Sequence, residues 1–348
     1  MKVGLIGCGR AAFLHMIVYK NIQNLKVMAV SDIDESKARA FAQRFNIDKF
    51  STDYSDILKI EDLDFVDICT PTSTHAKIAL EVAEAGHNIL LEKPMALTTK
   101  ECEKIIQGTK KHGVNLCVCH SRLFDPLVKL AENMVNSEKY DVMFFKGTIK
   151  QNAELVGAPS WVLTPKEKGV LWETGCHYAY LLLHFLPNIK QVYAVGYKVK
   201  YPVYDTLAAI FRGHDKTYAT MEISWLAEEP TVLYEIGSSD GRSLQMDLLS
   251  KKLSEKKKGS RPKRLWNELY SDIKNGIKKY LRYANEIFRK NELNICLPHF
   301  YLITSFLESL KKDLPAPVTG EEGKRTISLL ECIEKSLTTH TPVNFGED

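Results

Sequence analysis

Residues 1–12 read Met-Lys-Val-Gly-Leu-Ile-Gly-Cys-Gly-Arg-Ala-Ala, a short apolar run that leads into a Gly-x-Gly-x-x-Ala motif. In such a motif Gly7 permits a tight turn, and Gly9 lets the backbone approach a pyrophosphate. A small residue at position 12, here Ala12, lets the following helix pack closely against the strand. The stretch therefore predicts the first strand, turn and helix of a dinucleotide-binding βαβ unit.

The residues after this turn supply the other parts of such a unit. Arg10, Ala11 and Ala12 open the expected helix, whose first N–H groups have no partner within the helix and can face phosphate oxygens. A second apolar run, residues 27–30, leads to Asp32, which is placed to accept hydrogen bonds from the adenosine ribose hydroxyls. A 2′-phosphate would be repelled there, so NAD is favoured over NADP. The plainer alternative is a glycine-rich turn that binds no ligand.

The composition is that of an ordinary globular protein. Of the 348 residues, 45% are hydrophobic and 26% are charged, and the length favours two domains. No apolar run reaches the length of a membrane span, and the first strand begins at residue 2, which leaves no room for a signal peptide. The eight cysteines form no C-x-x-C pair and lie mostly in apolar segments. We therefore expect reduced thiols in a cytoplasmic protein, and no metal site is predicted.

Strand and helix signals alternate over residues 1–121, which predicts a doubly wound parallel sheet. The strand signals are Val3–Ile6, Lys26–Val30, Phe65–Cys69, Asn88–Leu91 and Asn115–Cys119, and helical stretches lie near 11–23, 35–45, 54–59, 74–85 and 98–112.

Residues 122–348 predict a second, α+β domain with an open, mainly antiparallel sheet. Helices are expected near 125–138 and 172–186, and strands at Asp141–Lys150, Ile189–Val199, Leu207–Arg212, Thr217–Trp225, Val232–Gly237 and Ser243–Leu248. The turn-forming stretches 213–216 and 239–242 indicate two hairpins.

Two polar motifs follow buried strands of the first region, at the carboxyl edge of the sheet, where open α/β folds bind ligands. The first runs from Cys69 to His75, and its plainer reading is a turn in which Thr72 or Ser73 caps a helix. The second is Glu92-Lys93-Pro94. In a cleft its lysine can bind a substrate hydroxyl and take part in proton transfer, although an exposed turn would have the same residues.

The third motif is Gly169-Val-Leu-Trp-Glu-Thr-Gly-Cys-His177. At helical spacing Glu173 and His177 share one face. A carboxylate and an imidazole aimed at a cleft can move the proton of a sugar hydroxyl while hydride leaves the same carbon. Taken alone, His177 is better explained as a buried, hydrogen-bonded histidine.

Together these motifs resemble the glucose–fructose oxidoreductase / inositol dehydrogenase / MocA (Gfo/Idh/MocA) oxidoreductase family. The resemblance rests on Gly7-x-Gly9-x-x-Ala12-x-x-His15, Thr70-Pro71-x-x-x-His75, Glu92-Lys93-Pro94 and Gly169…Gly175-x-His177, in that order. It extends from residue 1 to about 250 and from about 297 to 330. It implies an amino-terminal Rossmann domain followed by an open-sheet domain.

The resemblance also implies roles. Lys93 would contact substrate and the nicotinamide ribose, and His177 would exchange a proton with the hydroxyl being oxidised. Arg122 would lie at the nicotinamide end, with Trp161 as an aromatic neighbour. The positions that would line the cofactor are Thr70, Pro71, His75 and Glu92.

The sequence departs from the family at Glu173, where the family usually has Asp. The extra methylene moves a carboxylate by about 1.5 Å, and a misplacement of that size can cost about a hundredfold in rate. Glu173 therefore indicates either a remodelled substrate or weakened dehydrogenase chemistry.

A second departure is the basic segment 251–294. Within it, residues 251–290 hold 14 Lys or Arg and 4 Asp or Glu, which gives a net charge of +10. Because the whole chain has a net charge of +4, the remaining residues together carry a net charge of −6. Residues 251–264 predict a loop, and 265–288 an amphipathic helix. That helix would cover the sheet, form a subunit contact, or meet an anionic lipid surface or glycan. Nucleic-acid binding is not expected, because no groove-reading motif accompanies it.

The sequence thus predicts an NAD-dependent oxidoreductase of carbohydrate metabolism, acting on a secondary hydroxyl or ketone of a sugar, nucleotide-sugar or cyclitol. We expect a homo-oligomer in which Lys93, His177 and Glu173 are catalytic. Two alternatives remain: a glycosidase of the same fold that uses bound NAD in a redox cycle, and a non-catalytic NAD-binding subunit.

Overall fold

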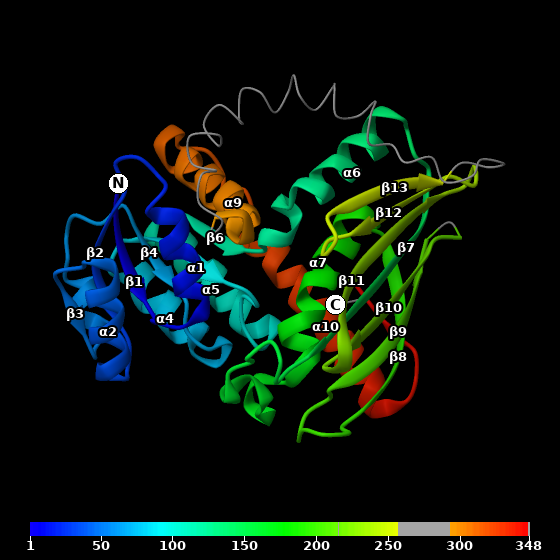
Figure 1. Ribbon diagram of the computed structural model, residues 1–348, viewed down its shortest axis with the longest axis horizontal. Helices are drawn as coiled ribbons and strands as arrows, with labels where there is room; N and C mark the ends of the chain where they lie inside the picture. Colours follow the sequence, from blue (N-terminus) through cyan, green and yellow to red (C-terminus); the bar gives the residue numbers. More distant parts are fainter. Residues whose placement is uncertain (215, 257–292, 347–348) are drawn as a thin grey trace. The chain divides into compact units, whose positions relative to one another are not determined.

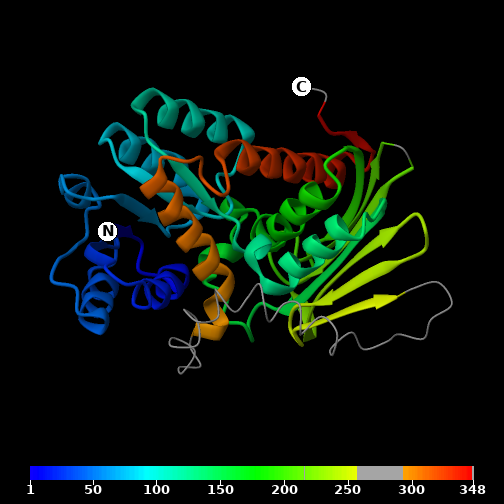
Figure 2. The same cartoon turned by 90° about the horizontal axis from the view of Figure 1, so that it is seen from above.

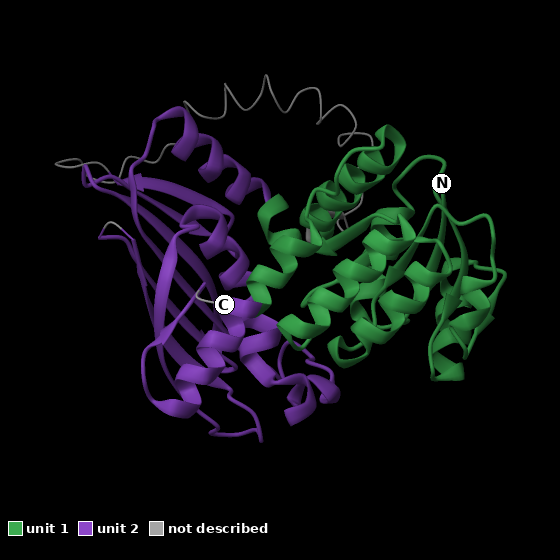
Figure 3. Cartoon of the chain, turned by 180° about the vertical axis from the view of Figure 1, so that it is seen from behind, with its two compact units in different colours: residues 1–124, 291–327 green, residues 125–290, 328–348 purple. Residues whose placement is uncertain are grey.

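The computed structural model describes residues 1–214, 216–256 and 293–346. The chain forms two compact units, one of residues 1–124 with 291–327 and one of residues 125–290 with 328–348 (Figure 3). We expected a single passage from the first domain to the second after residue 121. The chain instead returns to the first unit, because α9 (Leu293–Lys312) packs along α1 (Arg10–Tyr19).

The first unit is built on a six-stranded sheet of order β3-β2-β1-β4-β5-β6, in which every neighbouring pair is parallel (Figure 1). Its strands are β1 (Lys2–Ile6), β2 (Lys26–Ser31), β3 (Phe50–Ser51), β4 (Phe65–Ile68), β5 (Asn88–Glu92) and β6 (Leu116–Cys119). This confirms the doubly wound parallel sheet. The strand order reverses between β1 and β4, and ligands of such sheets bind at the carboxyl ends beside that point.

The helices of the first unit begin and end at residues suited to those positions. Asp34 accepts hydrogen bonds from the amides at the start of α2, and Thr98 forms a capping box with Glu101 at the start of α5. Gly113 ends α5 with φ of +65°. Besides α1 and α9, the helices are α2 (Glu35–Phe45), α3 (Ser55–Leu58), α4 (Thr72–Glu84), α5 (Thr99–His112) and the 3₁₀ turn η1 (Ser121–Phe124).

The second unit contains an eight-stranded sheet of order β13-β12-β11-β7-β10-β9-β8-β14. The β7–β10 pair is parallel and the other pairs are antiparallel, so the predicted mainly antiparallel sheet is confirmed. Both predicted hairpins are present, as β9–β10 and β11–β12. The strands are β7 (Val142–Asn152), β8 (Ile189–Tyr197), β9 (Thr206–Gly213), β10 (Tyr218–Ser224), β11 (Leu226–Ser238), β12 (Ser243–Asp247), β13 (Lys252–Lys256) and β14 (Val343–Asn344).

Helices lie against one face of this sheet (Figure 2). They are α6 (Pro126–Ser137), α7 (Cys176–Phe185) and the part of α10 (Gly320–Thr339) that belongs to the second unit. Gly147 in β7 makes the close packing possible, because a Cβ there would lie 2.5 Å from the Tyr178 ring. Residues along β8 and β9 alternate between buried and exposed, so the opposite face is exposed. Short turns η2 (Ser160–Leu163) and η3 (Pro165–Glu167) precede α7.

The basic segment is described only at its start. The predicted loop over 251–264 is wrong there, since β13 pairs with β12. Residues 257–292, with the predicted apolar stripe of 265–288, lie outside the described residues. None of the helices in the described part of the chain is long and apolar enough to cross a membrane. All eight cysteines are described, and no two of them form a disulfide.

Candidate active site

The turn between β1 and α1 has the backbone that the glycine motif predicts. Gly7 has φ of +94° and donates its N–H to the carbonyl of Ser31 at 2.7 Å. A Cβ on Gly7 would lie 2.5 Å from the carbonyl oxygen of Cys69, whereas a Cβ on Gly9 would have no atom of the described residues within 4 Å. Only glycine fits at position 7, and the bare backbone at position 9 leaves room for a ligand.

The first turn of α1 presents amide groups beside this open space. Gly9 is the N-cap residue, and the first turn contains Arg10, Ala11 and Ala12 with no acidic side chain. Ala12 is fully buried, as the close packing of helix on strand requires. The first amides of α1 can donate to the oxygens of a pyrophosphate, and the first turn holds no acidic side chain that would repel it.

Asp32 follows β2, and backbone donors on both sides fix its carboxylate. Oδ2 accepts the N–H of Cys8 at 2.9 Å, and Oδ1 accepts the N–H of Asp34 at 3.0 Å. Burial of the Cys8 thiol, together with the nearby Asp32 charge, raises the pKa of Cys8 to about 12. The carboxylate is therefore held beside the glycine turn, as expected for a group that accepts ribose hydroxyls.

The loops after β4 and β5 are joined through His75. Its Nδ1 lies 2.9 Å from the carbonyl oxygen of Pro94, and its Nε2 lies 2.9 Å from that of Thr70. Because β4 and β5 are neighbours, Thr70, Pro71 and the Glu92-Lys93-Pro94 motif lie at one sheet edge. The predicted cap by Thr72 or Ser73 is wrong, since Pro71 occupies the N-cap position and no side chain caps α4.

Glu92 and Lys93 stand at the end of β5, as predicted. The Lys93 N–H donates to Glu92 Oε2 at 3.0 Å. Burial alone would raise the pKa of Glu92, but contact with His15 and nearby positive charges lower it to about 2. Burial and the charge of Lys93 lower the pKa of His120 to about 3. The Lys93 ammonium therefore lies among these buried groups of the first unit.

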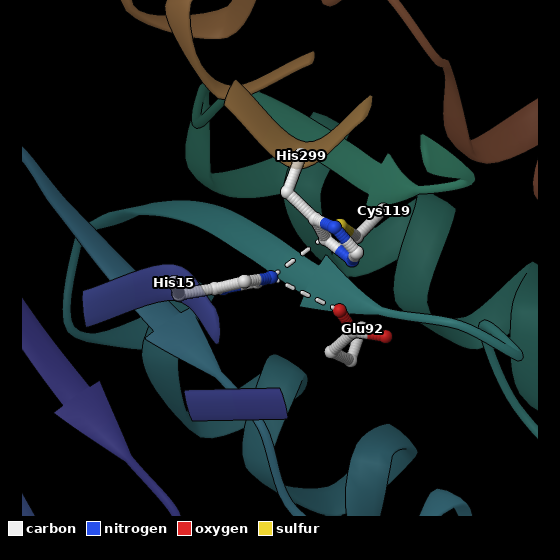
Figure 4. A group of neighbouring side chains, drawn as sticks. All are labelled: His15, Glu92, Cys119 and His299. Carbon is white, nitrogen blue, oxygen red and sulfur yellow. Dashed lines mark hydrogen bonds and ion pairs between the residues drawn. The ribbon is translucent and has the colours of Figure 1, made fainter. Parts of the chain in front are cut away.

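A buried network behind Glu92 was not predicted from the sequence. His15 Nδ1 lies 2.8 Å from Asp67 Oδ2, and the hydroxyl of Tyr19 donates to the same oxygen at 2.6 Å. On the other side of the ring, His15 Nε2 lies 3.0 Å from Glu92 Oε1 (Figure 4). Burial of His15 opposes its charge, but Asp67 and other acidic neighbours raise the pKa of His15 well above its usual value. Asp67 gave one usable signal, because an acid inside a buried strand requires a polar partner.

Arg122 lies in η1 of the same unit, near His299 of α9. Burial, His15 and the positive charges of Arg122 and Lys93 lower the pKa of His299 to about 4. Ser121 Oγ lies 3.3 Å from His299 Nε2. Arg122 and Lys93 thus both lie near His299, and the role of Arg122 at the nicotinamide end stays a prediction.

In the second unit, the segment with Glu173 and His177 is a π-helical turn, η4 (Leu171–Gly175), followed by α7. Gly169 precedes it with φ of +67°, where a Cβ would lie 2.7 Å from the side chain of Val203. Thr174 in the turn accepts a hydrogen bond from Trp225 Nε1 at 3.0 Å. A π-turn inside a helical segment often marks a functional site.

Glu173 and His177 are both half-buried on this segment, and Trp161 lies in η2 with its side chain partly exposed. These three residues belong to the second unit, and Lys93 and Arg122 belong to the first. The grouping of Lys93 with His177 in one site stays a prediction.

Comparison with known proteins agrees with this arrangement. Residues 1–120 match the oxidoreductase family with an NAD-binding Rossmann fold, and residues 131–243 match the GFO/IDH/MocA C-terminal domain. The two matches lie in the two units described above.

Individual relatives are more distant. An uncharacterized oxidoreductase of Bacillus subtilis, YrbE, is 37% identical over 134 residues, 38% of this chain and 39% of the relative. D-apiose dehydrogenase of Paraburkholderia graminis is 23% identical over 247 residues, 69% of this chain and 66% of the relative. The chain therefore matches less than two thirds of the length of each.

Among solved structures, levoglucosan dehydrogenase in complex with NADH superimposes with a TM-score of 0.84 at 19% identity, over 100% of both chains. At that identity the likeness concerns the fold. Both domain matches and the full-length likeness in fold lead to one assignment: the chain belongs to the Gfo/Idh/MocA oxidoreductase family.

Proposed function

We propose that this protein is an NAD-dependent oxidoreductase that transfers hydride between nicotinamide and a secondary hydroxyl or ketone of a sugar, nucleotide-sugar or cyclitol. The observation that carries the proposal is the sheet edge of the first unit. There an open glycine turn, a carboxylate held by two backbone amides and the Glu92-Lys93 pair follow strands of one parallel sheet.

The residues present fit NAD. Gly9 leaves space for a pyrophosphate, the first amides of α1 can donate to its oxygens, and Asp32 can accept ribose hydroxyls. When bound, NAD would supply the hydride acceptor.

The proposed division of labour among the chain's own residues follows from their chemistry. The Lys93 ammonium would bind the substrate oxygen and stabilise negative charge on it. A ring nitrogen of His177 would take the hydroxyl proton, and Glu173 would orient or charge-stabilise that imidazole. In the reverse direction the same imidazole would return the proton.

The direct test is a substrate screen that follows NADH absorbance with free sugars, cyclitols and nucleotide-sugars. On the substrate found, Lys93→Ala and His177→Ala should each lower kcat/KM at least about a hundredfold, the lower end of what positioned acid–base groups contribute. The exposed residues Lys100 and His214 provide matched controls, Lys100→Ala and His214→Ala, which should keep wild-type rates. Near-wild-type activity of either site variant would refute the role of that residue.

The same screen separates the two alternatives. Bond cleavage without net NADH, by a protein that keeps NAD through gel filtration, would identify the NAD-using glycosidase. Tight NAD binding with no turnover of any substrate class would identify a non-catalytic subunit.

A homo-oligomer is part of the proposal. The exposed face of the second sheet carries an apolar group, named here the sheet patch, of Tyr193, Val195, Tyr197, Ile210 and Tyr218. Tyr193 and Ile210 lie directly opposite each other on β8 and β9. A second copy of the chain would cover this patch with the same residues. A cytoplasmic location is also proposed, because eight cysteines without a disulfide are typical of a reducing compartment.

A further inference from the structure

Four side chains of the first unit converge behind the sheet edge (Figure 4). They come from four elements: His15 from α1, Glu92 from β5, Cys119 from β6 and His299 from α9. Each offers one nitrogen, oxygen or sulfur atom, and these atoms all lie within 4.8 Å of one another. His15, Glu92 and Cys119 are buried, and His299 is partly exposed, so the group has one side through which an ion can enter.

One separation in the group is close to that between ligands of a tetrahedral ion, and a second is shorter. With Zn–N of about 2.0 Å, Zn–S of about 2.3 Å and Zn–O of about 2.1 Å, tetrahedral angles place N and S about 3.5 Å apart and N and O about 3.4 Å apart. Cys119 Sγ lies 3.6 Å from His15 Nε2. Glu92 Oε1 lies 3.0 Å from the same nitrogen.

The orientation of His15 also suits a metal ligand. Its Nδ1 can donate to Asp67 Oδ2 at 2.8 Å, and once the ion has displaced the proton on Nε2, the lone pair of that nitrogen would face the group. A histidine that binds a metal commonly donates its other N–H to a carboxylate in this way.

Two buried atoms of the group lack an aligned donor or acceptor. Glu92 Oε1 has no hydrogen bond of proper geometry among the described residues, despite its nearness to His15. His299 Nδ1 is likewise buried without a hydrogen-bond partner in that part of the chain, while Ser121 Oγ lies 3.3 Å from Nε2. A buried polar atom without a hydrogen-bond partner requires an explanation, and a bound ion is one that accounts for both atoms.

We propose that His15, Glu92, Cys119 and His299 bind one Zn²⁺ in a closed, four-coordinate structural site inside the first unit. Two histidines, a thiolate and a carboxylate are all ligand types that Zn²⁺ accepts. The thiolate and carboxylate charges balance the ion, and the protons displaced from the Cys119 thiol and from His15 Nε2 pass to solvent.

The ion would tie the returning helix α9 to the sheet that holds the proposed active site. It would also fix Glu92 Oε1, while Oε2 keeps the backbone N–H of Lys93 at 3.0 Å. The inference does not depend on the proposed oxidoreductase activity, because its readout is metal content.

The test is elemental analysis of the full chain, stripped with a chelator, reloaded with Zn²⁺ alone and passed through gel filtration. We expect about one Zn²⁺ per chain. Reloading with Co²⁺ should give a thiolate-to-cobalt charge-transfer band. Cys119→Ala should abolish that band, His299→Ala should lose the ion, and Asp67→Asn should weaken Zn²⁺ binding about 10–100-fold.

Two control variants separate this site from others. Cys69 contacts His15 Nδ1 and Asp67 but is outside the four ligands, and Cys102 is a buried cysteine of α5. Cys69→Ala and Cys102→Ala should keep one Zn²⁺ and the cobalt band. Wild-type protein without stoichiometric Zn²⁺ after reloading would overturn the proposal, even if the ligand variants fail to fold. Retention of the ion by Cys119→Ala would also overturn it.

Discussion

We expect Asp32 to determine which nicotinamide cofactor the first unit prefers. Its carboxylate is held by the N–H groups of Cys8 and Asp34, so it cannot swing away to make room for a 2′-phosphate. We expect tighter binding of NAD than of NADP, and Asp32→Ala should narrow the difference. Calorimetric titration with both cofactors measures it. Asp34→Ala is the control, because Asp34 caps α2, and its loss should cost about 1 kcal/mol of stability with the preference unchanged. Tighter NADP binding by the wild type would contradict the assignment.

We expect Gly7 to be required for the stability of the fold and Gly9 to be required for NAD binding. Gly7→Ala should cost more than about 1–2 kcal/mol of unfolding free energy, because φ of +94° is unfavourable for alanine and the Cβ would strike Cys69. Gly9→Ala should leave stability unchanged, since φ is −88° and the Cβ meets open space, yet it should weaken NAD binding at least about tenfold by keeping the pyrophosphate away. Urea unfolding and NAD titration of both variants check this. NAD binding by Gly9→Ala equal to the wild type would remove the pyrophosphate assignment.

The sequence predicted those residues whose role is local to a motif. Gly7 is defined by the turn it makes, and Lys93 by its place at a strand end. Cys119 and His299 could not be predicted as neighbours, because only the return of α9 to the first unit brings them together. The partner of Asp67 could not be predicted either, because the carboxylate in β4 contacts His15, which lies on α1 and is distant in the sequence.

Helices α6 and α7 of the second unit are linked by one partly buried pair. His184 Nε2 donates to Glu132 Oε1 at 2.8 Å, and Lys129 contacts Oε2. These hydrogen bonds, against some burial, lower the pKa of Glu132 to about 2. A carboxyl with a depressed folded pKa adds stability above its unfolded value of about 4.5 and loses it as pH falls toward 2.

Glu132→Gln should therefore lower the unfolding free energy near neutral pH by about 1 kcal/mol, the scale of such exposed pairs. The gap between wild type and variant should close as pH falls from about 4.5 toward 2. Urea denaturation across that range measures it. Glu154→Gln, which breaks an exposed pair with Lys200, is the control and should change stability little at any pH. If the difference in unfolding free energy between wild type and variant stayed constant with pH, the lowered pKa of Glu132 would not contribute to stability.

Elements with a clear sequence period between residues 1 and 250 were predicted well, and short or irregular ones were not, and the long helices α9 and α10 were not predicted either. The two-residue strand β3 has no run long enough to show a period. Strand β11 begins at Leu226, earlier than predicted, because its register with β7 shifts between Leu226 and Thr231. Pro230 lies in that interval, and a proline cannot donate to a sheet ladder, so the regular part of the strand begins after it, near the predicted start at Val232. The π-turn before α7 looked like ordinary helix, since its residues suit either.

The division of the whole chain into units depends on packing that no local pattern reveals. The change from alternating strand and helix to consecutive strands was visible near residue 121, and the first unit does extend to 124. Helix α9 belongs to the first unit because it packs against α1. The sequence pattern therefore indicates the domain boundary at which the chain leaves the first sheet. It does not indicate that a later segment, α9, packs on the first unit again.

The sheet patch supports a prediction about the assembled molecule. Tyr197 is 69% exposed and Ile210 is 60% exposed on a sheet face that none of the described helices of its own unit covers. A monomer would leave this apolar surface exposed to water. In a dimer with two-fold symmetry, the same patch of each copy would contact the other copy, so both patches would be buried. Ile210→Asp places a carboxylate directly opposite Tyr193 and next to its own copy in such a pair, so it should reduce the oligomer order.

Light scattering after gel filtration at several concentrations decides between these states. Leu249→Asp is the matched control, because Leu249 is 50% exposed in the second unit but outside the sheet patch, and its variant should assemble as the wild type does. Dissociation of Ile210→Asp with NAD affinity retained would locate the interface on this face and show that the first unit binds its cofactor without it. A monomeric wild type, or an Ile210→Asp variant that assembles unchanged, would remove the sheet patch as the contact and leave its exposure to be explained by another occupant.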